Sequence, residues 1–430
     1  MTGRPPPRLP RLRTALGVLS LTAAFALAVG WSLLPGPFLP APTGPHPIGT
    51  AVFTVVDGSR PEIFGPDPDA PRTLTAQLWY PAAHAPGIRT VSVTPEAAPG
   101  TADSPRPNAP AAPEPYLPDS AVLDPMLEYA HLPRLLFARL AHAPTHAIAD
   151  AAPADGRFPV VFFLTGNMGY RGSNLVQIEE LASHGYVVVG LDQPGVVGSA
   201  ETPAGRIPYA GRTVVKPLVD QSFRPWATAP VWRGVAYPRG IVPYLAADPR
   251  AVLDRLSQPG APLAGRLDLA RVGAFGISLG GLDLSQWCAT DARLRACLFL
   301  DAPMSADASA RGLGVPSLWL TRSASAMRAE GWPDVEVRTY AEGQRALFER
   351  TRADAWYLEV AGARHADFTD APYESPLPGL AGITSPGDGV HLHEVMRRTT
   401  VAFFDRTLRG DPSLSVLDAS PWPDVSLTRR

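Results

Sequence analysis

The pentapeptide GISLG at positions 276–280 constrains the fold of this 430-residue chain more than any other segment. A short apolar run comes before it and a helical pattern starts directly after it, which is the strand, sharp turn and helix of a nucleophile elbow. Glycines on either side let the turn close around Ser278 in a strained backbone conformation. The hydroxyl would then lie over a helix N-terminus, where backbone N–H groups stabilise a developing negative charge. The motif predicts Ser278 as a nucleophile, and a structural loop serine is the alternative.

Strand-like and helical patterns alternate along most of the chain. A continuous apolar run at 158–164 is typical of a strand buried on both faces. The alternation predicts an α/β fold with a doubly wound, mostly parallel sheet. Further strands are predicted at 186–191, 271–277, 296–300, 317–321 and 355–360, and an antiparallel edge at 50–56 and 74–80, the latter with one buried face. Helices are predicted at 123–140, 174–182 and 342–351, from an N-cap at Asp248, and in a last segment that ends before Gly410.

Residues 1–34 have the pattern of a targeting segment. Arginines at positions 4, 8, 11 and 13 precede an uncharged apolar run at 14–34, which is long enough to span a bilayer. The positive-inside rule places the arginines in the cytoplasm and the rest of the chain outside. We expect an extracytoplasmic protein, held at the membrane by an uncleaved signal anchor or secreted after cleavage. A cytosolic protein with an apolar N-terminus is the third alternative. Residues 35–48 are expected to form a stiff proline-rich tether.

The remaining sequence is predicted to form one α/β domain over residues 49–412, followed by a C-terminal tail at 413–430. A Pro/Ala-rich stretch at 94–118 has little to bury and is expected to be a mobile excursion. Residues 201–239 match no regular template, and Trp226 and Trp232 within them suggest an irregular cap or lid beside the site.

Charge and cysteine content limit the partners of the chain. The formal net charge is −2 and no basic block lies outside the N-terminus, so nucleic acid is not an expected partner. His391 and His393 have metal-like spacing, but no carboxylate or cysteine cluster accompanies them, and neither a metal nor another cofactor is expected. Cys288 and Cys297 are the only cysteines, and the sequence leaves open whether they form a disulfide or stay as buried thiols.

Chain order directs the search for the partners of Ser278, because the acid and then the histidine follow the serine in folds that carry this elbow. Only His365, His391 and His393 lie beyond it. His365 comes just after the predicted strand at 355–360, and sites assemble at the carboxyl ends of strands. The other two open the last helix, where helix entry or solvent contact is the expected role. His365 is therefore predicted as the general base.

Asp301 is predicted as the acid. In many proteins with this elbow the acid follows the second strand after it, but here the strand at 317–321 is followed by no carboxylate until Glu330. One strand earlier, the run at 296–300 leads directly into Asp301, whose buried charge would need a partner such as a histidine N–H. Other aspartates are expected to play other roles: Asp283 and Asp291 as solvated surface charges, and Asp367 and Asp370 as residues that shape the His365 loop.

With these spacings the sequence resembles the secreted platelet-activating-factor acetylhydrolases, the lipoprotein-associated phospholipase A2 family, and their bacterial relatives. The acid that follows the elbow by one strand is the most specific shared feature. The resemblance spans roughly residues 50–410, with shared stretches LWYP at 78–81, FPVVF at 158–162, TG at 165–166, LASHGYVVV at 181–189, GISLGG at 276–281, LDAPM at 300–304, GARHADF at 362–368 and AFFD at 402–405.

The resemblance implies an α/β-hydrolase that cleaves esters without metal or calcium. It also implies an oxyanion hole made by the backbone N–H groups of Leu279, directly after the nucleophile, and of Asn167. The sequence departs from many relatives at Thr165, Ile277 and Gln193, which are expected to line the pocket. The departures leave the chemistry intact and the substrate open.

These inferences predict a serine ester hydrolase that resembles platelet-activating-factor acetylhydrolase. Ser278 would attack an ester carbonyl, His365 would take its proton, Asp301 would orient the imidazole, and water would release the acyl group. Expected substrates are small-molecule or lipid esters with short acyl chains, phospholipids included. Two alternatives remain: a general esterase, lipase or polyester hydrolase on the same triad, and a membrane-anchored binding protein without turnover.

Overall fold

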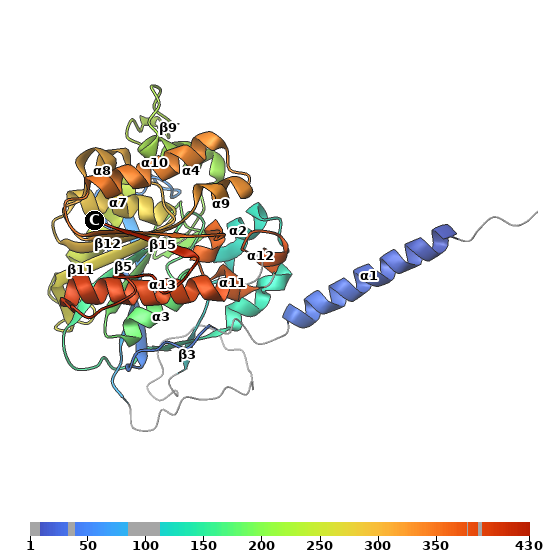
Figure 1. The fold of residues 1–430 in the computed structure, drawn as a ribbon, viewed down its shortest axis with the longest axis horizontal. Helices are drawn as coiled ribbons and strands as arrows, with labels where there is room; N and C mark the ends of the chain where they lie inside the picture. Colours follow the sequence, from blue (N-terminus) through green and yellow to red (C-terminus); the bar gives the residue numbers. More distant parts are fainter. Residues whose placement is uncertain (1–8, 33–38, 85–111, 376, 386–388) are drawn as a thin grey trace, which may run out of the picture.

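The structure, a computed structural model, describes residues 9–32, 39–84, 112–375, 377–385 and 389–430. Its centre is an 11-stranded sheet with the strand order β15-β14-β13-β12-β11-β5-β6-β2-β1-β4-β3 (Figure 1). The strands are β1 (Ile48–Pro61), β2 (Pro71–Pro81), β3 (Pro113–Pro115), β4 (Pro144–Ala149), β5 (Phe158–Leu164), β6 (Val187–Asp192), β11 (Leu267–Ile277), β12 (Leu294–Leu300), β13 (Ser317–Arg322), β14 (Ala355–Val360) and β15 (Val425–Arg429).

The middle of the sheet is parallel. Strands β6, β5, β11, β12, β13 and β14 run in the same direction as their neighbours. Antiparallel β2 borders this block on one side and antiparallel β15 borders it on the other. The predicted doubly wound, mostly parallel sheet is therefore confirmed. Because parallel strands share one carboxyl edge, loops that follow β11, β12 and β14 meet at the same edge.

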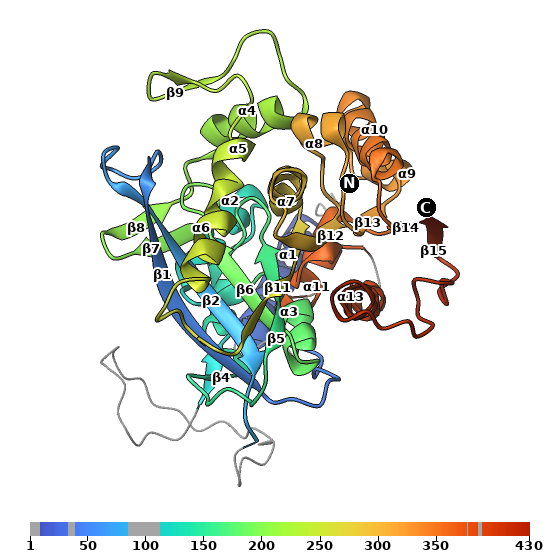
Figure 2. The ribbon, with the colours of Figure 1, turned by 90° about the vertical axis from the view of Figure 1, so that its left-hand side faces the viewer.

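Helices cover both faces of the parallel block, which explains the continuous apolar run in β5. Val161 and Phe163 pack with α3 and α13 on one face, and Val160 and Phe162 pack with α6, α7 and α10 on the other. Figure 2 shows these two helical layers with the sheet between them. The covering helices are α3 (Leu175–Ser183), α6 (Ala247–Leu256), α7 (Leu279–Thr290), α10 (Asp334–Arg350) and α13 (Gly389–Phe404).

Two local predictions in this block need correction. Strand β2 is buried on both faces rather than one, because it lies inside the sheet and touches both α3 and α6. Helix α6 begins at Ala247, so Asp248 is its second residue and not its N-cap. The Asp248 carboxylate instead pairs with Arg72 of β2. Tertiary contacts, which local sequence does not show, decide both features.

Residues 201–239 are more regular than predicted. The segment begins within a hairpin and continues through a helix and a second hairpin. A small apolar core packs these elements against Leu279 and Leu282 at the start of α7. The expected irregular cap is therefore a packed cap that rests on the elbow helix. Its elements are β7 (Ser199–Thr202), β8 (Gly205–Pro208), α4 (Arg212–Phe223), β9 (Val231–Trp232) and β10 (Val235–Ala236), with α5 (Val242–Leu245) after them. The four strands are only two to four residues long, and Pro217 interrupts the pattern of α4, so the segment shows no clear sequence period.

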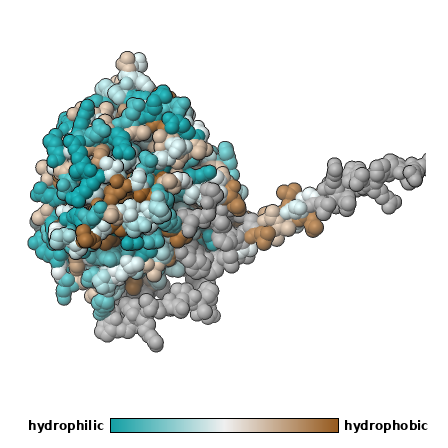
Figure 3. All heavy atoms as spheres, in the orientation of Figure 1, coloured by the Kyte–Doolittle hydropathy of each residue, from teal (hydrophilic) through white to brown (hydrophobic). Residues whose placement is uncertain are grey.

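The N-terminal region differs from its prediction in two ways. Helix α1 (Leu9–Ser32) extends away from the sheet in Figure 1 and takes in Arg11 and Arg13 as well as apolar residues. None of the helices in the described residues is both long and apolar enough to cross a bilayer, so the predicted membrane-spanning helix is not found. Figure 3 shows apolar residues along the part of this helix that is coloured by hydropathy.

The segment predicted as a tether is docked where the structure describes it. The backbone N–H of Thr43 donates to Glu180 of α3 at 3.0 Å, and that of Gly44 donates to the Ser183 hydroxyl at 3.1 Å. Residues 33–38 lie outside the described residues. The part of the tether from 39 onward is therefore fixed to the body of the protein.

Two further predictions concern residues 94–140. Positions 94–111 of the predicted excursion lie outside the described residues, whereas Tyr116 and Leu117 are buried core residues. The helix predicted at 123–140 is broken, because Pro133 disfavours helical geometry in Leu132 before it. The segment forms η1 (Ser120–Leu123), α2 (Asp124–Tyr129) and η2 (Arg134–His142).

The C-terminal part of the chain completes the sheet. Helix α13 continues into η4 (Asp405–Arg409) and ends at Gly410, whose left-handed φ of 72° matches the predicted stop. Residues 413–430, expected as a tail, include the edge strand β15. The remaining elements are α8 (Ala306–Arg311), α9 (Ala324–Ala329), η3 (His365–Phe368), α11 (Ala371–Glu374) and α12 (Leu377–Leu380).

Cys288 and Cys297 form a disulfide, which settles the alternative that the sequence left open. Their Cα atoms are 6.6 Å apart, and the bond joins α7 to β12. It therefore links the helix after Ser278 to the strand before Asp301. A structural disulfide is typical of an oxidising compartment and suggests an extracytoplasmic protein.

Candidate active site

The elbow places Ser278 between β11 and α7 in a strained conformation, with φ 54° and ψ −118°. A Cβ atom on Gly280 would lie 2.1 Å from the Leu164 carbonyl oxygen, and one on Gly276 would lie 2.6 Å from the backbone of Gly280. Only glycine fits at either position. The close approach of β5, β11 and α7 thus holds a partly exposed serine in a backbone conformation that few residues adopt.

Asp301 and His365 meet at the carboxyl edge of the sheet. Asp301 directly follows β12 and is fully buried, and His365 opens η3 after β14. His365 Nδ1 lies 2.5 Å from Asp301 Oδ2, and the Thr321 hydroxyl donates to Oδ1 of the same carboxylate at 2.9 Å. Because Nδ1 donates to the carboxylate, Nε2 is left as the basic nitrogen of the imidazole.

Burial and charge act in opposite directions on Asp301. Burial alone would raise the pKa of its carboxyl group, but the Arg322 charge and the hydrogen bonds from His365 and Thr321 together hold the pKa below its ordinary value of 3.8. The group is therefore an anion at neutral pH. A buried anion beside an imidazole stabilises the imidazolium that forms when histidine takes a proton.

Ser278 ends up at the same sheet edge as the Asp301–His365 pair, because β11, β12 and β14 are linked in register through β13. Among the residues that the structure describes, His365 has a hydrogen bond to Asp301 and none to Ser278. Catalytic hydrogen bonds are often long before substrate binds, so the free serine is compatible with a nucleophile.

The two predicted oxyanion donors lie beside Ser278. A Cβ atom on Gly166 would be 3.3 Å from the Ser278 Cβ, which places the loop before Asn167 against the elbow. Within the described residues, neither the backbone N–H of Asn167 nor that of Leu279 donates a hydrogen bond. The Asn167 side chain donates to the Tyr209 hydroxyl at 3.1 Å, so the cap helps to hold this loop.

Sequence reasoning missed a charged pair behind the histidine. Arg322 ends β13 with a fully buried side chain, and its Nε lies 2.9 Å from Asp301 Oδ2. Its other end forms an ion pair with Glu330, which also accepts the backbone N–H of His365 at 3.2 Å. The available signal was a charged residue, Arg322, at the carboxyl end of β13, the strand next to β12.

Asp283 contradicts its prediction as a surface charge. Its side chain is fully buried in α7, and neither carboxylate oxygen has a hydrogen-bond partner among the described residues. Burial raises its pKa well above 3.8, and the negative charge of Asp248 raises it further. Asp283 is therefore protonated over a pH range where ordinary aspartates are charged.

The other acidic candidates serve the fold. Asp291 is half-buried and accepts hydrogen bonds from Trp287 and Arg293. The expectation that Asp367 shapes the histidine loop is confirmed, whereas the side chain of Asp370 bonds the start of α3 instead. Asp367 accepts the backbone N–H groups of Arg364 and Ser385, and Asp370 accepts those at the start of α3.

His391 and His393 take no part in the site. His391 contacts Asp424 at 3.1 Å. His393 is buried rather than solvent-exposed, its Nε2 lies 2.9 Å from the Thr369 carbonyl oxygen, and burial lowers its pKa to about 3. The described residues contain no group of three or more histidine, cysteine, aspartate or glutamate side chains placed to hold a metal ion.

The positions expected to line the pocket are buried in the fold instead. Thr165 bonds the Ser173 hydroxyl at 2.7 Å, and Ile277 belongs to the core beneath α3 and α13. The Gln193 amide donates to the Leu245 carbonyl oxygen and to Asp248. These departures therefore change the packing around the site rather than its surface.

Comparison with solved structures gives a likeness over almost the whole chain. The chain is similar to a ferulic acid esterase from Streptomyces cinnamoneus, with a TM-score of 0.66 and 27% sequence identity over 91% of this chain and 98% of that one. No protein-family model matches the sequence, and no curated protein matches it. The fold is that of α/β-hydrolase esterases, while the finer resemblance to platelet-activating-factor acetylhydrolases is not shown.

Proposed function

We propose that this protein is a serine carboxylic-ester hydrolase with Ser278 as nucleophile, His365 as base and Asp301 as the orienting acid. The observation that carries the proposal is the hydrogen bond between the buried Asp301 and His365 at the sheet edge that also presents the strained Ser278. The structural likeness to an esterase supports the same reaction class.

In the proposed mechanism the Ser278 hydroxyl attacks the ester carbonyl carbon while His365 Nε2 takes its proton. The resulting imidazolium is stabilised by the anionic Asp301 and then protonates the leaving alcohol. Water attacks the acyl-enzyme with His365 again acting as base, and the acid is released from Ser278. No cofactor is required for either half-reaction.

The tetrahedral oxyanion would be held by the backbone N–H groups of Asn167 and Leu279. Both are free donors within the described residues, and Leu279 is the first residue of α7. The N-terminus of this helix adds a favourable dipole. Preorganised donors of this kind are worth about 10²-fold to 10³-fold each in kcat.

Two substrate classes are proposed. The sequence resemblance favours short-chain acyl esters, phospholipids among them, and the structural neighbour favours aromatic acyl esters such as feruloyl esters. A series of p-nitrophenyl esters from acetate to decanoate, measured beside methyl ferulate, separates them by kcat/KM. A steep fall beyond the shortest chains supports the first class, and preference for methyl ferulate supports the second.

Labelling with a fluorophosphonate probe tests the nucleophile without a choice of substrate. We expect wild-type protein to label and Ser278→Ala to lose both labelling and at least ~10³-fold in kcat. The matched control is Ser257→Ala, an exposed serine at the end of α6, which should label like wild type. A folded wild-type protein that does not label would favour the non-catalytic binding protein, and labelling of Ser278→Ala would mean another nucleophile.

A further inference from the structure

Arg322 is a buried cation that the proposed mechanism does not use. It is the last residue of β13, the strand between β12, which leads to Asp301, and β14, which leads to His365. Its side chain has 0% exposure. A charge at such a position is costly unless its partners compensate it. Both of its partners contact His365.

The first partner is the carboxylate of Asp301. Arg322 Nε lies 2.9 Å from Asp301 Oδ2, the same oxygen atom that accepts His365 Nδ1 at 2.5 Å. The guanidinium, through an ion pair, and the imidazole, through a hydrogen bond, therefore contact the same carboxylate oxygen. The position of Arg322 thus bears on the orientation of the carboxylate toward the imidazole.

The second partner is Glu330, just after α9. Its Oε1 pairs with the guanidinium of Arg322 and also accepts the backbone N–H of His365 at 3.2 Å. The contacts close a ring from Arg322 through Asp301 to the His365 side chain, and from the His365 backbone through Glu330 to Arg322. The histidine is thereby tied at both its ring and its main chain.

Charge and ring stacking, rather than ideal hydrogen bonds, hold the guanidinium in this ring. Among the described residues, none of the three Arg322 side-chain nitrogens has a hydrogen bond of good geometry, despite the short ion pairs. The Trp332 ring lies 4.5 Å from the guanidinium carbon, and its centroid is 6.0 Å from that of the His365 ring. Tryptophan is the best cation–π partner for arginine.

We infer that Arg322 is a positioning residue of this site, which fixes Asp301 and Glu330 on two sides of His365 and sets the orientation and basicity of the imidazole. The inference rests on the proposed function, because it assigns a role in that reaction. Arg322 touches neither substrate nor reacting atoms in this account, and it acts through the two carboxylates.

A charge count gives the direction of the effect. Arg322, Asp301 and Glu330 together carry one net negative charge, which a protonated His365 neutralises. Without Arg322 the imidazole would face two uncompensated carboxylates and would hold its proton to a higher pH.

Other titratable groups near the ring do not change this sign. Tyr340 of α10 and Tyr357 of β14 couple to Asp301, but burial raises the pKa of both phenols far above neutral pH, so neither is charged there. Asp367, two residues after His365, accepts the backbone N–H groups of Arg364 and Ser385. Neither of these two hydrogen bonds to Asp367 involves Arg322.

The test is the pH dependence of the second-order rate of fluorophosphonate labelling in the full-length protein. For Arg322→Met we expect the acid limb of the profile to move to higher pH by on the order of one unit. The plateau rate should fall by up to roughly 10²-fold, because the imidazole is less well oriented. Arg322→Lys keeps the charge and should leave the acid limb close to wild type while lowering the plateau.

Glu330→Gln should shift the acid limb in the opposite direction. It also tests the inference if Arg322→Met does not fold. It removes one negative charge near the histidine, so the acid limb should move to lower pH. The matched control is Arg328→Met, in which a half-exposed arginine of α9 loses its pair with Asp334. Its profile should coincide with that of wild type.

The outcomes separate this inference from the proposed function. Wild-type protein without labelling contradicts the function itself. Two results overturn the inference and leave the function standing, provided that wild-type protein is labelled. The first is an acid limb at the wild-type pH in folded Arg322→Met. The second is an acid limb at the wild-type pH or at higher pH in Glu330→Gln. A purely structural arginine would change the folded fraction, measured by thermal melting, without moving the limb.

Discussion

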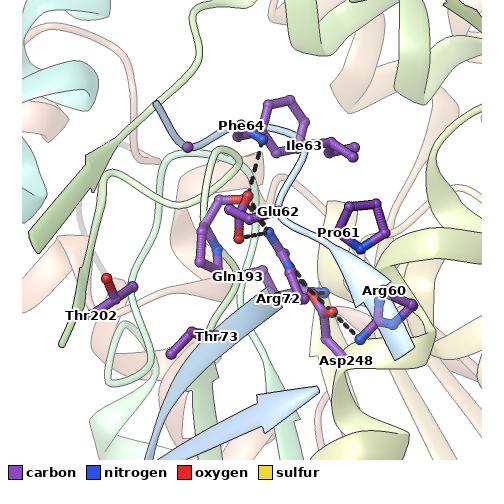
Figure 4. A network of polar contacts seen from close by, with 12 residues as sticks. Arg60, Pro61, Glu62, Ile63, Phe64, Arg72, Thr73, Gln193, Thr202 and Asp248 are labelled. Carbon is purple, nitrogen blue, oxygen red and sulfur yellow. Dashed lines mark hydrogen bonds and ion pairs between the residues drawn. The ribbon is translucent and has the colours of Figure 1, made fainter. Parts of the chain in front are cut away.

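Among the residues that the structure describes, two arginines are fully buried, and they are held in different ways. Arg72 of β2 makes hydrogen bonds from all three of its side-chain nitrogens to Glu62 and Asp248 (Figure 4). It also donates to the Pro194 carbonyl oxygen. Arg322 of β13 makes ion pairs of similar length but no hydrogen bond of good geometry within the described residues. Every side-chain nitrogen of Arg72 is therefore hydrogen-bonded and, in the part of the chain that the structure describes, none of those of Arg322 is.

The difference follows from what surrounds each cation. The Arg72 cluster joins β1 and β2 to α6, includes Arg60 beside Asp248, and contains no residue of the proposed triad. The Arg322 cluster shares its carboxylates with His365. Saturated buried networks serve the stability of a fold, whereas local rules are relaxed at sites where a group must serve two partners. The comparison therefore predicts that the Arg72 cluster governs stability and the Arg322 cluster governs rate.

The largest expected effect is in the Arg322 cluster. Asp301→Asn keeps the size of the side chain but no longer stabilises the imidazolium or fixes its tautomer, so kcat should fall about 10⁴-fold. The measurement is steady-state hydrolysis of p-nitrophenyl acetate. Unfolding by urea should show a folded protein, and a loss of less than tenfold in kcat would remove Asp301 from the triad.

Arg72→Met should affect stability instead. It leaves Glu62 and Asp248 buried without their main counter-charge, which should cost about 3–5 kcal/mol in the free energy of unfolding. The labelling rate per folded molecule should match wild type. Arg322→Met should cost less stability, because Asp301 keeps its bonds from Thr321 and His365. If urea unfolding showed a larger loss of stability for Arg322→Met than for Arg72→Met, the assigned roles of the two clusters would be wrong.

The smallest effect concerns Asp283, which couples to the Arg72 cluster. Unfolded chain loses this proton near pH 3.8, while the raised pKa keeps it on the folded protein. Stability from this group is complete below pH 3.8 and falls as pH rises toward the raised pKa. Asp283→Asn carries no such proton, so it should equal wild type near pH 4 and exceed it in unfolding free energy at pH 8.

A matched control is Asp155→Asn, whose side chain is fully exposed. Its stability relative to wild type should not change between the two pH values. A difference in unfolding free energy between Asp283→Asn and wild type that stays the same from pH 4 to pH 8 would contradict the raised pKa.

The sheet was predictable because runs of apolar residues in the sequence indicate its buried strands. β5 and β12 are apolar at nearly every position, as strands covered on both faces must be. The cap was not predictable, since β7 to β10 are two to four residues long and leave no period to detect. Asp283 was misassigned because a charge on a helix is usually solvated, and only packing on α7 reveals otherwise.

The site divides in the same way. Ser278 comes from a local motif, and Asp301 and His365 come from their places at strand ends, so chain order was enough to select them. Arg322 and Glu330 act through contacts between β13, the loop after α9 and η3, and no local pattern encodes such contacts. Sequence therefore predicts the chemical groups, while their electrostatic setting requires the tertiary structure.

The sheet is complete only when strand β15 has paired with β14. Of the strands in the sheet it is the last to leave the ribosome, and until it does, the N–H and C=O groups along one side of β14 have no partner strand. An open edge of this kind is a template for pairing with another chain. Until β15 pairs, the nascent protein therefore exposes an aggregation-prone edge beside the strand that leads to His365.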